Sequence, residues 1–173
     1  MASPLPVPFA NPILLADDKS QTTNSETVFV TLKRCKSGVI ADWLTRTKST
    51  PELNHLHLSD EERTRHLPKL LDDIVARLAE AKMLPTKDDD ADDSTAAVEH
   101  GRLRRTQRYT AAMLTHESRI LQVTIFDTLH KSLGVLDFNL LLPEVMIIAD
   151  EVDAQLTQAM EGYTSVVGTS AAA

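Results

Sequence analysis

The sequence predicts an all-α protein, and three observations lead to that expectation. Apolar residues recur at intervals of three and four over most of the chain, which is the spacing of one face of an α-helix. Only 5 of the 173 residues are glycine and aromatic residues make up 4 %, a composition that disfavours sandwiches and barrels. Hydrophobic residues reach 42 %, enough to fill a core. We therefore expect one globin-like helical bundle of about six helices.

Composition and charge also limit the class of protein. The formal net charge of −7 disfavours a nucleic-acid-binding surface. The single cysteine, Cys35, cannot form an internal disulfide, which fits a reducing compartment. No apolar run approaches the ~18 residues of a membrane span, and the N-terminus lacks the basic region of a secretory signal. We expect a soluble cytoplasmic protein with no nucleic-acid partner and no membrane partner.

The first helix is expected to start near Ser25 and to end before Pro51, because proline disfavours helical geometry in the residue before it. Its inward stripe consists of Val28, Leu32, Cys35, Val39 and Trp43. Residues 1–24 hold four prolines and a polar run, which predicts a flexible N-terminal tail. Trp43 is the expected core anchor, since an aromatic side chain buries the most apolar area.

The next helical region begins at Ser59, whose spacing to Glu62 is that of a capping box. Pro68 then interrupts the pattern, so that either a new helix starts near it or one longer helix bends. The stripe that follows lasts to about Lys82 and consists of Leu67, Leu70, Leu71, Ile74 and Leu78. The acidic run 88–93 lacks the glycine and the closing glutamate of a calcium-binding EF-hand, which predicts a solvated loop.

The remaining helices are expected from about Thr95 onward. Gly101 lies inside the first of them, where glycine is unfavourable by roughly 1 kcal/mol, so another helix backbone or a ligand should approach closely there. This helix bends near Thr110 or runs straight into the next, which Gly134 should end. The last helix should be capped by Asp137 and fray at Gly162. The helical domain then spans 25–162, and 163–173 is a flexible tail or a linker to an effector.

Residues 98–133 carry three of the six histidines, His100, His116 and His130, and the densest arginine cluster. His100 and Arg104 are four residues apart and so share a helix face. This pattern suits a polar pocket or an anion site. Charge runs on helices are usually solvated, however, and the local sequence therefore favours a surface with ordinary ion pairs.

Three kinds of chemistry have partial support from these histidines. His116 is followed by glutamate and an apolar segment, as in the phospho-acceptor box of histidine kinases, but the usual proline and the glycine-rich ATP-binding boxes are missing. Haem could use any of the three histidines, although the few aromatic residues argue against a haem cleft. His55 and His57 could bind a metal, but no further ligand completes a site. We expect no catalytic residue, no cofactor and no metal.

Three motifs together resemble the RsbRD-type N-terminal domain: HLPKLLDDIVARL at 66–78, HGRLRRTQRY at 100–109, and a glutamate at 117 followed by an apolar helix to 133. The resemblance covers about residues 38–161. The positions that match the family pattern are His100, Gly101, Arg104, Tyr109 and Glu117. Two positions depart from it, because Arg108 stands where the pattern has glycine and Gln122 where it has arginine.

The family lies at the front of bacterial sensor histidine kinases and of RsbR-like co-antagonists of the stressosome. The resemblance implies a sensory, non-catalytic domain related to globins, usually without haem. Such a domain forms homodimers and passes a signal to a C-terminal kinase or other effector. The five matching residues would then bind the signal or relay it, through an interior polar cluster. The alternatives left open are a haem-binding gas sensor and a histidine phosphotransfer protein that uses His116.

Overall fold

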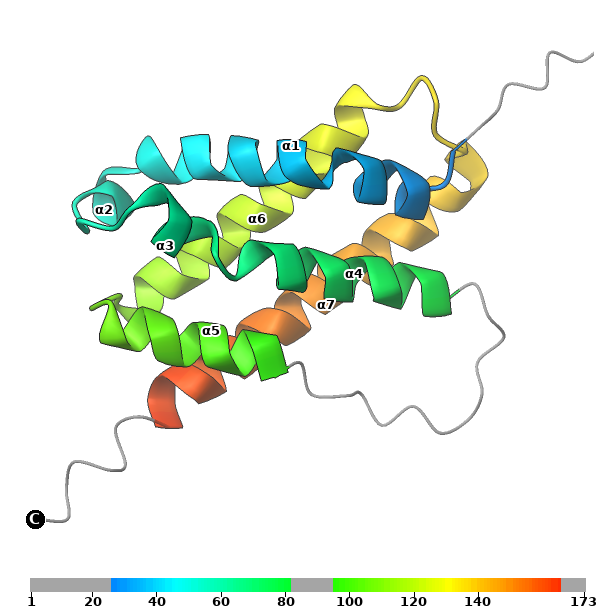
Figure 1. Cartoon of the computed structure of the whole chain (residues 1–173). Coiled ribbons are helices and arrows are strands. Elements are labelled where there is room, and N and C mark those ends of the chain that lie inside the picture. Colours follow the sequence, from blue (N-terminus) through cyan, green and yellow to red (C-terminus); the bar gives the residue numbers. More distant parts are fainter. Residues whose placement is uncertain (1–25, 82–94, 166–173) are drawn as a thin grey trace, which may run out of the picture.

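The computed structural model describes residues 26–81 and 95–165, and these residues form a bundle of α-helices (Figure 1). The helices are α1 Val28–Lys48, α2 Pro51–Asn54, α3 Asp60–Thr64, α4 Leu67–Glu80, α5 Thr95–Thr106, α6 Ala111–Lys131 and α7 Phe138–Ser165. Extended backbone pairs at one isolated bridge, between Glu26 and Leu136, and no strand occurs in the described ranges. The all-α prediction is therefore confirmed. The expected tail at 1–24 and the acidic run at 88–93 lie outside the described residues.

Polar side chains fix the starts of several helices. The Thr27 hydroxyl accepts a hydrogen bond from the backbone of α1, and Ser59 and Glu62 form the predicted capping box at α3. The Thr110 hydroxyl accepts from the third residue of α6, at 3.2 Å. Asp137 accepts from the backbone N–H of the second residue of α7, at 2.9 Å, as the sequence predicted. These caps supply acceptors to N–H groups that have no partner within their own helix.

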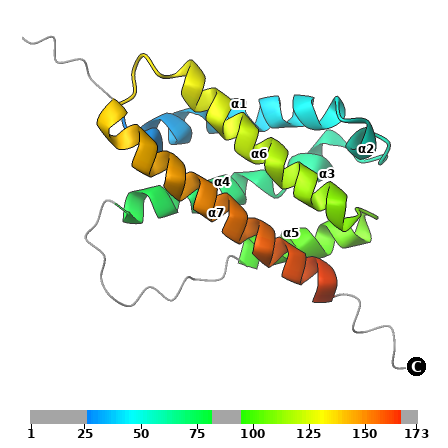
Figure 2. The same cartoon turned by 180° about the vertical axis from the view of Figure 1, so that it is seen from behind.

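The helices lie in two layers. Helices α1, α4 and α5 face the viewer in Figure 1, and α6 and α7 lie behind them and face the viewer in Figure 2. The most extensive pairing is between α5 and α7, while α1 packs across α6 and α4. Near Pro68 the structure has two helices and not one bent helix, because α3 ends at Thr64 and α4 begins at Leu67. A second break lies near Thr110, where α5 ends and α6 begins, so that these two helices can face each other.

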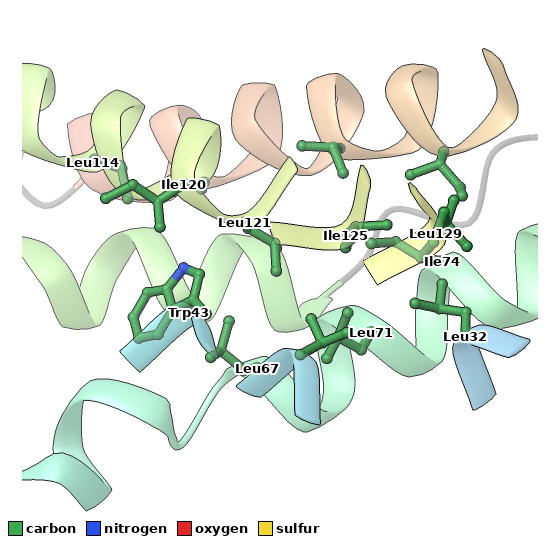
Figure 3. Packing of buried hydrophobic residues seen from close by; sticks show 14 of the residues in the cluster. Leu32, Trp43, Leu67, Leu71, Ile74, Leu114, Ile120, Leu121, Ile125 and Leu129 are labelled. Carbon is green, nitrogen blue, oxygen red and sulfur yellow. The ribbon is translucent and has the colours of Figure 1, made fainter. Parts of the chain in front are cut away.

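The apolar core lies between the layers and follows the predicted stripes. Figure 3 shows Trp43, Leu67 and Leu71 on one side and Leu121 and Ile125 on the other. Trp43, Leu71 and Ile125 are completely buried. All five predicted core residues of α4 are buried, whereas Cys35 of the α1 stripe is only half-buried. Each such apolar side chain contributes about 1.5–3 kcal/mol by leaving water.

Two glycines lie where the backbones of α5 and α7 touch. A Cβ atom on Gly101 would overlap the carbonyl oxygen of Ala159, and one on Gly162 would overlap that of Val98. The predicted close approach of another helix at Gly101 is therefore confirmed. The prediction that the chain frays at Gly162 is wrong, because this glycine is buried against α5 and α7 continues to Ser165.

Two further features of the described residues concern helix ends and length. Helix α6 ends at Lys131, and Gly134 is not in the left-handed conformation of a glycine stop signal, so the predicted role of Gly134 is wrong. The helix ends instead on Ser132, whose backbone N–H still donates into the last turn. None of the described helices has an apolar stretch long enough to cross a membrane.

Candidate functional site

The centre of the candidate site is an ion pair between Arg104 of α5 and Glu117 of α6. The Arg104 Nε donates to Glu117 Oε2 at 2.9 Å, and its Nη2 donates to Oε1 at 2.6 Å. The arginine side chain is 0 % exposed and the glutamate side chain 2 %. Removing such charges from water costs several kcal/mol per ion, and only near-ideal geometry with further hydrogen bonds offsets that cost. The two-point pairing is the geometry that the planar guanidinium favours.

The remaining hydrogens of Arg104 point to three further oxygens. Its Nη2 donates to the backbone oxygen of Arg63 at 2.7 Å and its Nη1 to that of Glu62 at 3.3 Å, both in α3. Its Nη1 also donates to Gln107 Oε1 at 2.6 Å. One guanidinium therefore holds the end of α3, the end of α5 and the first half of α6 together.

The Glu117 carboxylate accepts from two further side chains. His100 Nε2 lies 3.4 Å from Oε2, and the Tyr109 hydroxyl donates to Oε1 at 3.4 Å. Burial alone raises the pKa of Glu117, but the Arg104 charge and the His100 hydrogen bond outweigh it and leave the pKa below its ordinary value. Burial, and after it the nearby Glu117 charge, raises the pKa of Tyr109 to about 12. Glu117 is thus ionised at neutral pH and Tyr109 remains a donor.

Two histidine rings stack beside this pair. The ring centroids of His66 and His100 are 3.8 Å apart with an angle of 15° between the ring planes, and His66 meets the Trp43 ring edge-on at 5.8 Å. Burial, followed by the neighbouring His100 and then the positive charge of Arg104, lowers the pKa of His66 well below its ordinary value. Burial also lowers the pKa of His100, despite its hydrogen bond to Glu117. Both rings are therefore neutral at pH 7.

The structure brings together four of the five residues that the family pattern singled out. His100, Arg104, Tyr109 and Glu117 form one buried cluster, and Gly101 faces α7 on the adjoining side of α5. The expectation that His100 and Arg104 lie on a solvated surface is wrong. A partner on another helix offsets the cost of burying them, and the spacing of residues within one helix does not reveal that partner.

His66 and Arg63 are members of the site that sequence reasoning missed. The His66 Nδ1 lies 3.3 Å from Arg104 Nη2, whose two hydrogens point to Glu117 and to the backbone of Arg63, so a neutral ring nitrogen can accept only a shared hydrogen there. Arg63 is 3 % exposed and donates to the backbone oxygens of Leu53, Leu56 and Leu58, which closes the turn before α3. The H-L-P motif that begins at His66 was a signal in the sequence for that residue. No pattern in the sequence pointed to Arg63.

His116 and His130 lie apart from the cluster. His116 is half-buried and lines a hollow on the surface together with Pro51 and His55, whereas His130 is exposed. The three histidines considered as haem ligands therefore do not converge on one point. Arg108 is exposed, and its φ of 65° lies in the left-handed region where the family pattern has glycine.

A metal ion fits the cluster poorly. Within the described ranges, His66, His100 and Glu117 form one group whose possible ligand atoms lie within 4.8 Å of one another. Both Glu117 oxygens already accept from Arg104. The lone pair of a ring nitrogen lies in the ring plane, so two nearly parallel stacked rings cannot both point to one ion. The guanidinium charge beside His66 would also repel a cation.

A small cavity adjoins the cluster. The volume in which the centre of a water molecule can lie is about 20 Å³. One water needs roughly 10–15 Å³ by this measure, whereas pockets for drug-sized ligands and cofactors reach about 300–1,000 Å³. Its lining is His66, His100, Glu117, Ser118 and Gln155 together with apolar side chains of α1, α4, α6 and α7. This cavity cannot accept haem or an organic substrate.

A scan of protein-family models, a search of curated proteins and a search of solved structures found no match to this chain.

Proposed function

We propose that this chain is a non-catalytic sensory domain of a bacterial signal-transduction protein. In this proposal the cluster of His66, His100, Arg104, Tyr109 and Glu117, which we call the polar cluster, changes its arrangement in response to a signal or partner. Helix α7 then carries the change toward the C-terminus. The resemblance to RsbRD-type domains and the position of its motif residues in one cluster support the proposal.

The observation that carries it is the burial of the Arg104–Glu117 pair. Replacing a buried ion pair with apolar residues is often neutral or stabilising by about 1–4 kcal/mol. Stability alone therefore does not require two charges here. A cluster whose hydrogen bonds join three elements can instead have two arrangements of similar free energy, which is what a sensory domain needs.

Contacts at the end of α7 provide a route for the signal. The Tyr163 hydroxyl of α7 donates to the backbone oxygen of Tyr109 at 2.8 Å, and Arg105 Nη1 donates to that hydroxyl at 2.9 Å. Tyr109 itself contacts Glu117. At Gly101 and Gly162 the backbones of α5 and α7 touch directly, so that no side chain separates them at these two points. A movement of Tyr109 is therefore transmitted to the last turns of α7.

Comparing Glu117→Gln with Glu99→Gln tests the proposal by hydrogen exchange. The first substitution removes the charge from the polar cluster, and the second makes the same change at an exposed site on α5. We expect Glu117→Gln to speed exchange in α5 and in the last turns of α7, while α1 keeps its rates and Glu99→Gln changes nothing. A uniform increase in all helices, or a change confined to α5 and α6, would contradict a relay through α7.

We further propose a homodimer and a C-terminal kinase or other signalling effector in the cytoplasm, as the family resemblance implies. An apolar stripe on α7 supports self-association. Phe138, Leu142 and Met146 recur every four residues and are 67 %, 68 % and 64 % exposed. Exposed apolar side chains that follow one face of a helix are a candidate interaction surface.

Light scattering after size-exclusion chromatography tests the dimer. We expect a dimeric mass for the wild-type chain and a monomeric mass for Leu142→Glu. Ala154→Glu adds the same charge at an exposed position of α7 outside the stripe and is the matched control. A monomeric wild-type chain, or a dimer that Leu142→Glu leaves intact, would remove this stripe from the proposal.

A further inference from the structure

Gln155 of α7 has a buried acceptor without a donor. Its Nε2 donates to the backbone oxygen of Leu70 at 3.1 Å and to Glu151 Oε1 at 2.9 Å. These two bonds use both amide hydrogens and so fix which way the amide points. The opposite atom, Oε1, is buried and has no hydrogen-bond partner among the described residues. The side chain is rigidly held, and the residue is only 4 % exposed.

His100 of α5 presents a second such acceptor. Its Nε2 lies 3.4 Å from the Glu117 carboxylate, and a carboxylate can only accept, so Nε2 carries the hydrogen. In the neutral ring Nδ1 is then an acceptor. Nδ1 is buried and has no hydrogen-bond partner in the described part of the chain. A buried polar atom left in this state costs about 1–3 kcal/mol.

Both residues line the cavity beside the polar cluster. The rest of its wall is largely apolar and includes Trp43, Leu67, Leu114 and Leu121. About 20 Å³ admits a single molecule of the size of water. The two residues that carry the unpartnered acceptors thus line one small cavity. A ligand that satisfies both must donate two hydrogen bonds, which neither an anion nor an apolar gas can do.

We propose that this cavity is a binding site for one neutral, water-sized molecule that donates one hydrogen bond to His100 Nδ1 and one to Gln155 Oε1. Water is the simplest such ligand. The bound molecule joins α5 to α7 on the cluster side of the contact between Gly101 and Ala159. Buried waters that satisfy otherwise unpaired groups are integral parts of a protein structure and are costly to remove. The site does not depend on the sensory role proposed above.

The wild-type protein provides the first test, which needs no variant. Long-range ¹H–¹⁵N spectra of the histidine rings report the tautomer, and we expect His100 with its hydrogen on Nε2. Water–protein cross-relaxation in the amide and ring spectra should detect one long-lived water near the ring of His100 and the side chain of Gln155. A hydrogen on Nδ1, or the lack of a long-lived water at these two residues, would overturn the proposal.

The second test compares Gln155→Met with Gln122→Met. Methionine is close in shape to glutamine but lacks the amide oxygen. Gln122→Met makes the same change at a half-buried position of α6 that does not line the cavity. We expect Gln155→Met to abolish the water cross-peaks at His100 and Gln122→Met to keep them. Persistence of the water in a folded Gln155→Met protein would refute the bridging role. If Gln155→Met does not fold, the wild-type spectra alone decide.

The outcomes separate this proposal from the proposed function. If no water is detected but Glu117→Gln still speeds exchange in α7, the proposed ligand site is refuted and the sensory role is retained. A water present in a protein whose α7 does not respond to Glu117→Gln supports the site and removes the relay.

Discussion

The polar cluster and the apolar core around Trp43 lie side by side in one small bundle and are built in opposite ways. In the apolar core the loss of one side chain removes its contacts and leaves a cavity. In the polar cluster one carboxylate accepts from Arg104, His100 and Tyr109, so that no member is stable in the interior without the others. A loss in the first region therefore costs apolar contacts, whereas a loss in the second leaves a buried charged or polar group without its partner.

Substitution of Arg104 should have the largest effect and tests this contrast directly. We expect Arg104→Met to reduce the free energy of unfolding by about 3–5 kcal/mol, because it leaves Glu117 charged and buried without its partner. The double variant Arg104→Met/Glu117→Leu should recover most of the loss. Urea denaturation measures both. A Leu71→Ala control, expected to lose about 2–5 kcal/mol, should show no such recovery when Glu117→Leu is added. Equal losses in the single and double variants would erase the contrast.

Glycine substitutions compare the tight junction of α5 and α7 with the exposed surface of α1. Gly101→Ala should destabilise the protein by at least the ~1–3 kcal/mol of ordinary overpacking, because its Cβ meets the rigid backbone of Ala159. Gly38→Ala is the matched control, since Gly38 lies in α1 with no atom near its Cβ position. It should gain up to ~1 kcal/mol from higher helix propensity. Thermal unfolding of both variants checks the difference in sign.

Acid should weaken the polar cluster before it affects the apolar core. The pKa values of His66 and His100 lie below the unfolded value of about 6.5. The unfolded chain therefore binds more protons, and the stability present above pH 6.5 is lost as pH falls toward the folded pKa values. The slope approaches about 1.4 kcal/mol per pH unit for each histidine.

The lowered pKa of Glu117 acts in the same direction at more acidic pH, because its contribution is present above the ordinary value of 4.5 and is lost below it. Urea denaturation from pH 7.5 to pH 5 measures the histidine contribution. His100→Gln should reduce the slope, whereas the exposed His55→Gln should not. A flat profile across this range in the wild-type protein would show that these rings are not held neutral.

The smallest expected effect concerns the turn that separates the two helices of the ion pair. Arg108 adopts a φ of 65°, which costs a residue with a Cβ about 1 kcal/mol relative to glycine. Arg108→Gly should therefore raise the free energy of unfolding by a fraction of that amount, after the greater chain entropy of glycine in the unfolded state is subtracted. Arg102→Gly, at an exposed position inside α5, should instead lower the free energy of unfolding by about 1 kcal/mol.

The fold was largely predictable because periodicity is a local property. The stripes through Trp43 and Leu71, the capping box at Ser59 and the proline at 68 each act within a few residues, and each appears where the sequence places it. The cluster was less predictable. Motif resemblance selected Arg104 and Glu117, but local charge patterning pointed to solvent, because a guanidinium on a helix has the same spacing whether or not a carboxylate faces it.

The sequence by itself determined which segments are helical, where most of them start and which faces are apolar, since these depend on neighbours three or four positions away. Only the tertiary structure decided between a bend and a straight helix near Thr110, and placed Arg104 against Glu117. It also decided that His66 stacks on His100 and that Gly162 is packed rather than frayed. Each of these contacts depends on a partner from another helix, which offsets a cost of burial or fills a space. No local sequence pattern shows which partner that is.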